Sequence, residues 1–355
     1  MRIIRITGTG SALPGRIVTN KELEQLVETS DEWIRERTGI AERHVSVGET
    51  VVTLASEAAR KALEQAGKRA EEIDLILVAT CSPEQYLPCC ACQVQAAVGA
   101  VNALAFDVNA ACSGFLFALN TADAYLRTGL AKNALIIGSE VLSKLVDWKD
   151  RGSCILFGDG AGAVVVERCR TESRAVEYSN ALQETAEEKR IPAAGILGRA
   201  LHSDGTGGGV LQCGSRELTT PYARTSAAKT DQKQQTDDRE HYIQMDGQEV
   251  YRFATRRVPQ CIEEALSDAG LTVPDIDLFV LHQANARIID AVAKRLHADR
   301  DKFPTNLERV GNMSSASIPV LLDELNRQRK LHRGDRIVLA GFGAGLTIGA
   351  CVMTW

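Results

Sequence analysis

The sequence predicts an α/β fold built from two related halves, and two observations lead to this prediction. First, uninterrupted apolar runs of strand length, such as Ile73–Ala79, alternate with segments of helical apolar spacing along most of the chain. Strands that alternate with helices predict mostly parallel sheets covered on both faces. Second, two stretches of the first half recur in the second half at one common offset, as expected for an internal duplication. The matched stretches are Ala62–Gly67 with Ala265–Gly270 and Ile73–Val78 with Ile276–Leu281.

The size and composition of the chain are those of a globular protein. We divide its 355 residues into an N-terminal half at 1–170, an expanded polar connection at 171–242 and a C-terminal half at 243–355. A net charge of −5 argues against a general nucleic-acid binder. The sequence contains no run of 18 apolar residues that would span a membrane. Ten cysteines without a framework spacing favour reduced thiols in the cytoplasm.

The elements of the first half are predicted from apolar periodicity and from capping residues. A short strand at Ile3–Ile6 is followed by a turn region that contains Gly8 and Gly10. The other predicted elements are helices at Lys21–Thr29, from the cap Ser30 through Arg37, at Thr50–Ala66, Cys92–Val98 and Phe115–Leu126, and buried strands at Ile73–Ala79, Ala103–Val108, Ala134–Gly138 and Ala163–Glu167.

The second half repeats this order. A buried strand ends at Leu281, and an amphipathic helix that contains Arg287 follows it. Small polar residues after Gly311–Asn312 predict a capped start for a helix at Val320–Arg329. The segment Gly341–Gly345 is predicted to be a glycine-rich turn that points backbone N–H groups at an oxyanion.

Cys112 is the first candidate for chemistry. It lies where a predicted strand gives way to a predicted helix, and Ser113 and Gly114 keep the bend small enough for close approach. The partial positive charge of a helix N-terminus favours a thiolate, which is the nucleophilic form of cysteine. The alternative is an inert core cysteine, because free cysteines are usually buried.

Two further candidates come from the second half. His282 directly follows a buried strand, and ligands of open α/β sheets bind at the carboxyl ends of strands. Asn312 lies in the small polar segment that precedes the last predicted helix. The alternatives are a histidine satisfied by backbone groups and an ordinary turn asparagine.

Four motifs together resemble β-ketoacyl-acyl-carrier-protein synthase III, a family of the thiolase superfamily. The resemblance runs through nearly the whole chain and weakens only between Arg168 and Tyr242. It implies a five-layered α/β/α/β/α fold, which also explains the duplication. The motifs are Asp107–Phe115, Leu281–Asn285, Gly311–Pro319 and Gly341–Gly345.

The resemblance implies a decarboxylating condensation at a Cys-His-Asn set. Cys112 is implied as the residue that accepts the acyl group from acyl-CoA, with His282 and Asn312 stabilising the enolate formed when malonyl-acyl-carrier protein loses CO₂. The backbone N–H groups of Cys112 and Ala344 are implied as the oxyanion hole, with Ala344 replacing the usual glycine. Acyl-CoA is a substrate in this scheme, and no cofactor is implied.

The resemblance also implies a CoA site. Trp33 and Arg151 match the pair that holds adenine by stacking and cation–π contact. Gln248 stands where the family often has an asparagine, which puts one hydrogen bond to the pantetheine arm in question. The remaining implied CoA-binding residues are Arg37, Thr38, Gly247 and Asn285.

Residues outside the catalytic set bear on the primer and on the partners. Leu87 stands where the family often has a bulky aromatic residue that ends the partner subunit's acyl pocket, so a longer or branched primer is one interpretation. Cys89, Cys90 and Cys92 lack a matching histidine or second cysteine pair, so no metal site is predicted. Residues that share a helical face are candidates for docking an acidic carrier protein, or are simply solvated: Arg252 with Arg256, and Arg287 with Lys294 and Arg295.

The sequence therefore predicts an enzyme that condenses acyl-CoA with malonyl-acyl-carrier protein and initiates type II fatty acid synthesis as a cytoplasmic homodimer. The nearest alternative is a related enzyme of specialised metabolism. Alternatives from other classes are a Cys-His-Asn hydrolase and a non-catalytic acyl-CoA binder.

Overall fold

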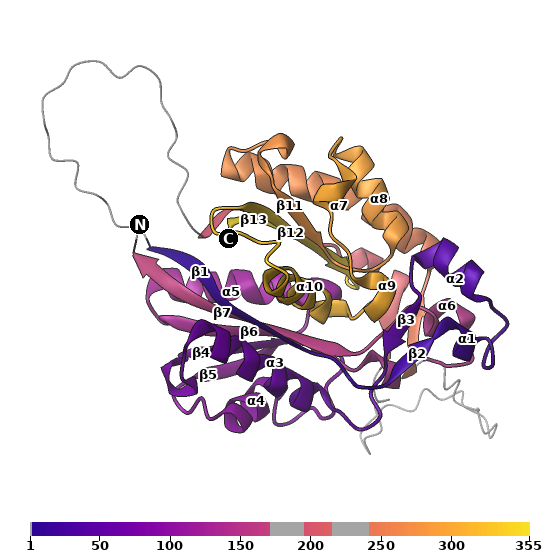
Figure 1. The fold of residues 1–355 in the computed structure, drawn as a ribbon, viewed down its shortest axis with the longest axis horizontal. Helices are drawn as coiled ribbons and strands as arrows, with labels where there is room; N and C mark the ends of the chain where they lie inside the picture. Colours follow the sequence, from indigo (N-terminus) through magenta and orange to yellow (C-terminus); the bar gives the residue numbers. More distant parts are fainter. Residues whose placement is uncertain (1, 171–194, 215–240) are drawn as a thin grey trace, which may run out of the picture.

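A computed structural model of the chain describes residues 2–170, 195–214 and 241–355. Within these residues two β-sheets lie face to face, with helices between them and on both outer sides. Figure 1 shows the resulting order of layers: α3 and α4, the first sheet, α5 and α10, the second sheet, and then α7 and α8. The five-layered α/β/α/β/α arrangement expected from the resemblance is confirmed.

Both sheets are mixed, so the prediction of mostly parallel sheets is wrong. The first sheet has the order β1-β7-β6-β4-β5, in which β7 is antiparallel to both neighbours while β4 is parallel to β5 and β6. The second sheet has the order β11-β12-β13-β8, and only β11 and β12 are parallel. The alternation of helices and strands did not reveal that a short link joins β12 to β13, which favours antiparallel pairing, or that β7 runs antiparallel to β6 after the longer segment 141–159.

The strands of the two sheets are bounded as follows: β1 Arg2–Ala12, β4 Leu75–Ala79, β5 Leu104–Val108, β6 Asn133–Glu140 and β7 Gly160–Arg170 in the first, and β8 Gly195–Ser203, β11 Leu278–Leu281, β12 Arg336–Gly343 and β13 Thr347–Thr354 in the second. The layer helices are α3 Val51–Ala66, α4 Cys90–Val98, α5 Gly114–Thr128, α7 Gly247–Ala269, α8 Ala286–Arg295 and α10 Ser317–Arg327.

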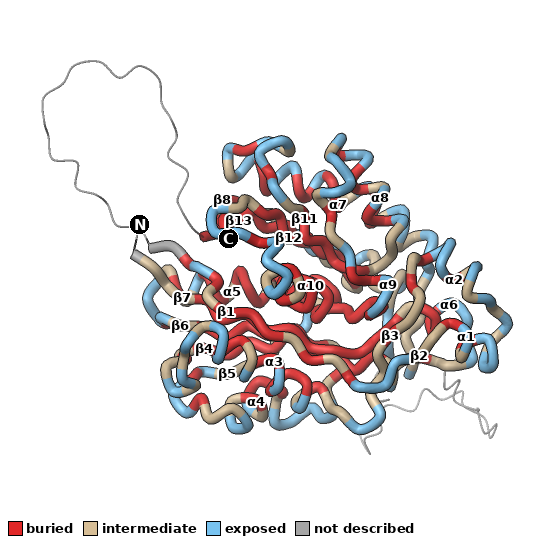
Figure 2. The backbone as a smooth tube through the Cα atoms, in the orientation of Figure 1, coloured by how far each residue is buried: buried red, intermediate tan, exposed pale blue. Residues whose placement is uncertain are grey.

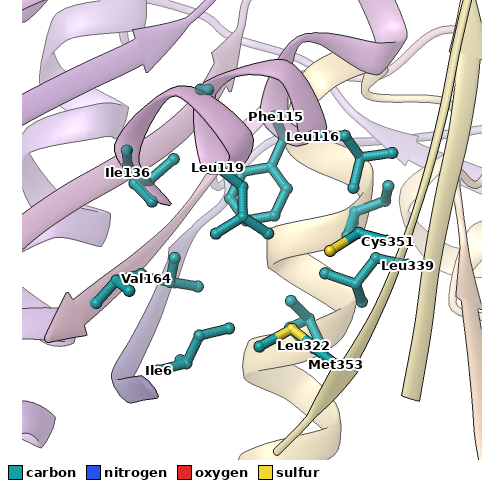
Figure 3. Close-up of a cluster of buried hydrophobic side chains, with 14 of the residues drawn as sticks. Ile6, Phe115, Leu116, Leu119, Ile136, Val164, Leu322, Leu339, Cys351 and Met353 are labelled. Atoms are coloured by element: carbon teal, nitrogen blue, oxygen red, sulfur yellow. The ribbon is translucent and has the colours of Figure 1, made fainter. Parts of the chain in front are cut away.

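Three apolar clusters hold the layers together. The central cluster joins the inner faces of both sheets to α5 and α10, and Figure 3 shows Phe115 and Leu119 of α5 facing side chains from both sheets and from α10. The two outer clusters pack α3 and α4 on the first sheet and α7 and α8 on the second. Figure 2 shows that the strands and the two central helices are the most buried parts of the chain. The central helices therefore start in the interior, between the two halves.

The sequence repeat corresponds to one structural unit in each half. Helix α3 ends at Gly67 and helix α7 ends at Gly270, and both glycines have a left-handed backbone, with φ of 63° and 66°. A 3-10 turn and a buried strand follow each helix, β4 in one half and β11 in the other. The duplication is thus present in the fold as well as in the sequence.

Several predicted bounds differ from the structure. Strand β1 continues to Ala12 instead of turning at Gly8, because both glycines of this stretch lie against the backbone of α3. Helix α1 covers only Asn20–Leu23, and α10 begins at Ser317. Strand β8 lies within the predicted connection 171–242, so the second sheet uses residues before 243. The parts of that connection at 171–194 and 215–240 lie outside the described residues.

Short elements gather at one end of the layers and frame the site. They pack around a fourth apolar cluster that includes Ile34 and Phe157. They are β2 Ile17–Thr19, α1 Asn20–Leu23, α2 Asp31–Thr38, β3 Glu42–His44, η3 Leu142–Lys144, α6 Arg151–Cys154, η4 Gly205–Val210, β9 Leu211–Cys213, β10 Ile243–Met245 and α9 Leu307–Val310. The remaining short turns are η1 Ala70–Glu72, η2 Ala111–Ser113, η6 Val273–Asp275, η7 Arg300–Lys302 and η8 Ser314–Ala316. In the described part of the chain, no helix is both long and apolar enough to cross a membrane.

Candidate active site

A cavity of about 1030 Å³ opens between the two halves. Cys112 from the first half and His282 and Asn312 from the second half all line it, although they lie far apart in the sequence. Most of the predicted CoA-binding residues line the same cavity toward its rim: Trp33, Arg37, Thr38, Gly247, Gln248 and Asn285. The three predicted catalytic residues and this set therefore share one space.

Cys112 lies in η2, the turn that precedes α5. The preceding residue, Ala111, has a φ of 45°. Gly343 packs so closely on Cys112 that a Cβ added at Gly343 would lie 2.7 Å from the Cys112 nitrogen. Burial raises the pKa of Cys112 to about 12, opposed by a hydrogen bond from Ser314 and reinforced by the charge of Glu140. The expected bias toward thiolate at a helix N-terminus is thus outweighed by burial, and the group is a thiol at neutral pH.

His282 follows β11 directly, as predicted. Its backbone N–H donates to the Ala340 carbonyl at 2.8 Å, which extends the pairing of β11 with β12 by one residue. Burial lowers the pKa of His282 to about 3, so the imidazole is neutral throughout the physiological range. The Phe342 ring contacts it edge-on, with 5.6 Å between ring centroids. A neutral imidazole can accept a proton at one ring nitrogen and donate a hydrogen bond from the N–H of the other.

Asn312 is fixed by its own backbone and by the turn that follows it. Its N–H donates to the Leu156 carbonyl at 2.9 Å, and its carbonyl accepts from the Gly158 N–H at 3.0 Å. Its side-chain oxygen accepts from the Ser314 N–H at 2.9 Å. With the amide oxygen engaged in this way, the NH₂ group is the part of the side chain that can donate to a ligand in the cavity.

The turn after β12 is linked by hydrogen bonds to the segment that contains Cys112. The Thr347 hydroxyl lies 3.0 Å from the Ala344 carbonyl, 3.2 Å from the Ala110 carbonyl and 2.6 Å from the Ser113 hydroxyl. The predicted glycine-rich turn is shorter than expected, because Gly341–Gly343 belong to β12. These contacts hold Ala344 next to the Cys112 segment.

The predicted adenine-binding pair is assembled at the rim. The Arg151 guanidinium lies 4.9 Å from the centroid of the Trp33 ring, and Arg37 lies 6.0 Å from the same ring on α2. The Arg151 side chain also donates to the Glu28 carbonyl at 3.1 Å. Since arginine and indole are in direct contact, a base that binds between them has to separate the pair.

Two other predicted CoA residues also hold the protein backbone. The Thr38 hydroxyl donates to the Ile34 carbonyl and accepts from the Ile40 N–H, which uses it to end α2. The Asn285 side chain caps α8 through the Arg287 N–H and donates to the Arg37 carbonyl at 3.0 Å. Asn285 thus joins α8 to α2 across the rim.

The predicted docking residues lie on α7 and α8. The structure links the two helices through Tyr251, because the Arg287 guanidinium lies 5.9 Å from the Tyr251 ring centroid. Arg252, beside Tyr251, pairs with Glu249, and Lys294 and Arg295 are exposed in the last turn of α8. Arg256 lines a separate cavity of about 540 Å³.

Leu87 does not line the large cavity and is 85% exposed in this single chain. Its expected role at another subunit's acyl pocket stays a prediction. The described residues contain no group of three or more His, Cys, Asp or Glu side chains that is arranged to hold a metal ion.

Residues that the sequence did not single out also shape the site. Gly343 allows the close approach to Cys112, the Ser314 N–H fixes the Asn312 side chain, and Phe342 packs on His282. Gly343 and Phe342 belong to a motif that was noticed, so a sequence signal existed for them. No signal marked Glu140, whose role depends on contacts between the halves.

A buried cysteine, a neutral histidine and an asparagine that meet between two duplicated halves of this five-layered fold define a condensing enzyme of the thiolase type. Models of the 3-oxoacyl-[acyl-carrier-protein] synthase III family match residues 106–182 and, for its C-terminal part, 266–355. The chain belongs to the β-ketoacyl-acyl-carrier-protein synthase III family, and it is therefore an acyltransferase-type condensing enzyme.

Relatives and solved structures support this membership over the full length. The chain is 44% identical over 355 residues to the β-ketoacyl-[acyl-carrier-protein] synthase III of Clostridium acetobutylicum, covering 100% of this chain and 99% of the relative. It is 46% identical over 354 residues to the enzyme of that name from Desulfitobacterium hafniense, covering 99% and 98%.

Among crystal structures, 3-oxoacyl-[acyl-carrier-protein] synthase III from Aquifex aeolicus superposes with a TM-score of 0.85 at 39% identity, covering 99% of this chain and 100% of that one. The priming β-ketosynthase of the R1128 polyketide pathway superposes with a TM-score of 0.84 at 34% identity, covering 99% and 96%.

Proposed function

We propose that this enzyme condenses an acyl-CoA primer with malonyl-acyl-carrier protein, giving β-ketoacyl-acyl-carrier protein, CO₂ and CoA, and so initiates type II fatty acid synthesis. The observation that carries the proposal is the single cavity that Cys112, His282 and Asn312 share with the predicted CoA-binding residues. Family membership supports the same reaction, since the relatives are named for it.

The first half-reaction transfers the acyl group to Cys112. The neutral His282 imidazole takes the thiol proton, and the sulfur attacks the thioester carbonyl of acyl-CoA. The oxyanion that forms accepts hydrogen bonds from the backbone N–H groups of Cys112 and Ala344. The intermediate collapses to the acyl-enzyme, and the departing CoA sulfur takes the proton back from His282.

The second half-reaction forms the carbon–carbon bond. Malonyl-acyl-carrier protein loses CO₂, and the electrons of the broken bond form an enolate at the thioester. His282, as an N–H donor, and the Asn312 NH₂ group stabilise the enolate oxygen. The enolate carbon attacks the acyl group on Cys112, the carbon–sulfur bond breaks, and the departing cysteine thiolate takes a proton from water. Because CO₂ loss supplies the carbanion, no cofactor is required.

The proposal includes binding partners. An acidic carrier protein is complementary to the arginines and lysine of α7 and α8, which border the cavity rim at Tyr251 and Asn285. A homodimer is supported by β5, an edge strand whose Leu104 is exposed, because unpaired edge strands invite pairing. A cytoplasmic location is supported by the ten unpaired cysteines.

A second candidate is a priming enzyme of specialised metabolism. The match to the R1128 priming β-ketosynthase, at 34% identity over nearly both chains, favours it. Activity with malonyl-CoA but none with malonyl-acyl-carrier protein would support this candidate. The hydrolase and the non-catalytic binder have no such support. Binding of acyl-CoA without any product from the wild-type protein would favour the binder.

The test is mass spectrometry after incubation with acyl-CoA primers of about two to twelve carbons. We expect one acyl group per chain, on the peptide that contains Cys112, and no adduct in Cys112→Ser. Cys169→Ser, at a half-buried cysteine on β7, is the matched control and keeps full acylation. An adduct on another peptide, or none with any primer, would contradict the proposal, and the preferred primer length reports on the pocket that Leu87 ends.

A further inference from the structure

Glu140 is a fully buried carboxyl group at the end of β6 for which the reaction scheme above has no use. Its oxygens accept hydrogen bonds from the Ser82 hydroxyl at 2.5 Å, the Ser315 hydroxyl at 2.8 Å and the Cys81 N–H at 3.1 Å. The Thr80 hydroxyl adds a fourth at 3.2 Å, and the Cys81 thiol lies 3.5 Å away. These contacts together fix the buried carboxyl group of Glu140 in one orientation.

The hydrogen-bond donors around Glu140 favour its charged carboxylate form. Ser82 uses its hydroxyl oxygen to accept from the Val141 N–H and keeps its own proton available for Glu140. Thr80 likewise accepts from the Ser82 N–H and has its proton free for Glu140. Burial raises the pKa of Glu140, but the donors of Ser82, Ser315 and Cys81 oppose that rise by solvating the charged form.

The contact with Ser315 connects this carboxylate to the catalytic set. Ser315 lies in η8, between Asn312 and α10, and its one hydroxyl proton is shared between Glu140 and the Ala79 carbonyl, which also lies 2.8 Å away. The backbone of η8 rests on β6, since a Cβ at Gly138 would lie 2.2 Å from the Ser315 carbonyl oxygen. Ser314, the residue before, donates its N–H to the Asn312 side-chain oxygen, and its turn η8 packs against η2, the turn that contains Cys112. One turn thus touches Glu140, Asn312 and Cys112.

The duplication relates Ser315 and Glu140 to two residues at the Cys112 site. Ser315 occupies the position of Cys112 in the second half, at the same offset as the sequence repeat, and both follow a residue with positive φ, Ser314 at 47° and Ala111 at 45°. Glu140 and Gly343 are counterparts in the same way. In one pair, Cys112 packs against Gly343 and lines the cavity. In the equivalent pair, Ser315 is hydrogen-bonded to the buried carboxyl group of Glu140.

We propose that Glu140 is a positioning residue, which fixes the Asn312–Ser315 segment against Cys112 through Ser315 and whose negative charge opposes ionisation of the Cys112 thiol. This inference rests on the proposed function and deepens it. The titratable groups that face Cys112 are Cys81 after β4, Glu140 at the end of β6 and His282 after β11. His282 is neutral, so Glu140 supplies the charge among them.

The test is Glu140→Gln, which keeps the shape and removes the charge, with Glu140→Asp as the variant that keeps the charge. The first measurement is the pH dependence of Cys112 alkylation by iodoacetamide, read by peptide mass spectrometry. We expect the midpoint to fall by roughly one pH unit in Glu140→Gln, because a neighbouring negative charge disfavours a thiolate, and to stay near wild type in Glu140→Asp. An unshifted midpoint in Glu140→Gln would overturn the inference.

The second measurement separates positioning from stability. In Glu140→Gln we expect at least a roughly tenfold loss of condensation with acylation of Cys112 retained, since the Asn312 side is released while the thiol remains. Ser315→Ala, which cuts the link but keeps the charge, should lose condensation without moving the alkylation midpoint, and it decides the question if Glu140→Gln does not fold. Equal loss of both half-reactions in Ser315→Ala would mean a merely structural role.

The controls keep this inference separate from the proposed function. Glu84→Gln removes a partly exposed carboxylate that pairs with Lys144 at 2.8 Å, and it should leave the alkylation midpoint unchanged. Alkylation needs no substrate. The pH midpoint of Cys112 alkylation therefore tests the effect of the Glu140 charge even if the wild-type enzyme accepts no acyl-CoA.

Discussion

At the scale of the residue, the active-site groups are tuned chiefly by burial. Burial keeps Cys112 a thiol and His282 a neutral imidazole, with pKa values of about 12 and about 3. A thiol and a neutral base in one cavity are suited to proton transfer at the moment of attack, and a preformed thiolate–imidazolium pair is not expected. Asn312 adds a donor whose orientation is set by Ser314.

Separate substitutions of His282 and Asn312 should divide the two half-reactions. We expect both His282→Ala and Asn312→Ala to lose decarboxylation by about 10²–10³-fold, because each removes a donor to the enolate oxygen. Asn312→Ala should still acquire the acyl group, whereas His282→Ala should also acquire it more slowly, because the imidazole takes the thiol proton. The measurement is single-turnover acylation alongside CO₂ release from malonyl-acyl-carrier protein. Unchanged acylation in His282→Ala would contradict its role as the proton acceptor of the first step, and equal loss of both steps in Asn312→Ala would contradict the role assigned to Asn312.

The buried His282 also makes a prediction about stability. In the unfolded chain a histidine has a pKa near 6.5, whereas folding lowers that of His282 to about 3. Below pH ~6.5 the unfolded state binds a proton that the folded state does not, so the free energy of unfolding falls as the pH falls, by up to about 1.4 kcal/mol per pH unit from this group. Urea unfolding between pH 5 and 8 should show a shallower slope for His282→Asn than for wild type.

The exposed His297 provides the control for that experiment, since His297→Asn should leave the slope of wild type intact. Parallel slopes for wild type and His282→Asn would show that the histidine is not buried as a neutral group.

At the scale of the element, close approach between β1 and α3 holds the first half together. A Cβ at Gly8 would lie 2.2 Å from the Ala62 carbonyl oxygen and 2.7 Å from the Ala66 nitrogen, both backbone atoms of α3. Glycine is required there because a strand and a helix touch, and the backbone of Gly8 needs no unusual conformation. The sequence showed the glycine but not the helix that it meets, which is why a turn was expected.

Gly8→Ala should therefore destabilise the fold. We expect a loss of roughly 1–3 kcal/mol in the free energy of unfolding, because the helix has to move away from the sheet. Gly15→Ala is the matched control, with no atom within 4 Å of the added Cβ, and should change stability by less than about 0.5 kcal/mol. Thermal and urea unfolding measure both, and similar values for the two variants would contradict the packing argument.

At the scale of the whole molecule, the predicted docking residues of α7 and α8 belong to the helices that contribute Tyr251 and Asn285 to the cavity. Arg287 and Arg252 flank Tyr251 beside the rim, so a carrier protein docked there has its pantetheine arm at the cavity. Charge on an exposed face acts chiefly on association and is screened by salt.

Arg287→Glu should raise the KM for malonyl-acyl-carrier protein several-fold more than the KM for acyl-CoA, and the difference should shrink as salt is added. Steady-state kinetics at low and high ionic strength measure this. Lys330→Glu, at an exposed lysine just after α10, is the control and should leave both KM values unchanged. An equal rise for both substrates would place Arg287 in the CoA site instead.

The sequence by itself determined the element types, the duplication and the three residues expected to act. Each of these signals is local or repeats along the chain: the caps of α3 and α7 at Gly67 and Gly270, the buried strand before His282, and the small bend at Cys112. Only the tertiary structure decided the mixed pairing of the sheets, the place of β8 in the second sheet, the ionisation of Cys112 and His282, and the contact of Ser315 with Glu140. Those features depend on which surfaces meet when two distant halves pack together, since burial and hydrogen bonding arise between residues whose separation along the chain leaves no periodic trace.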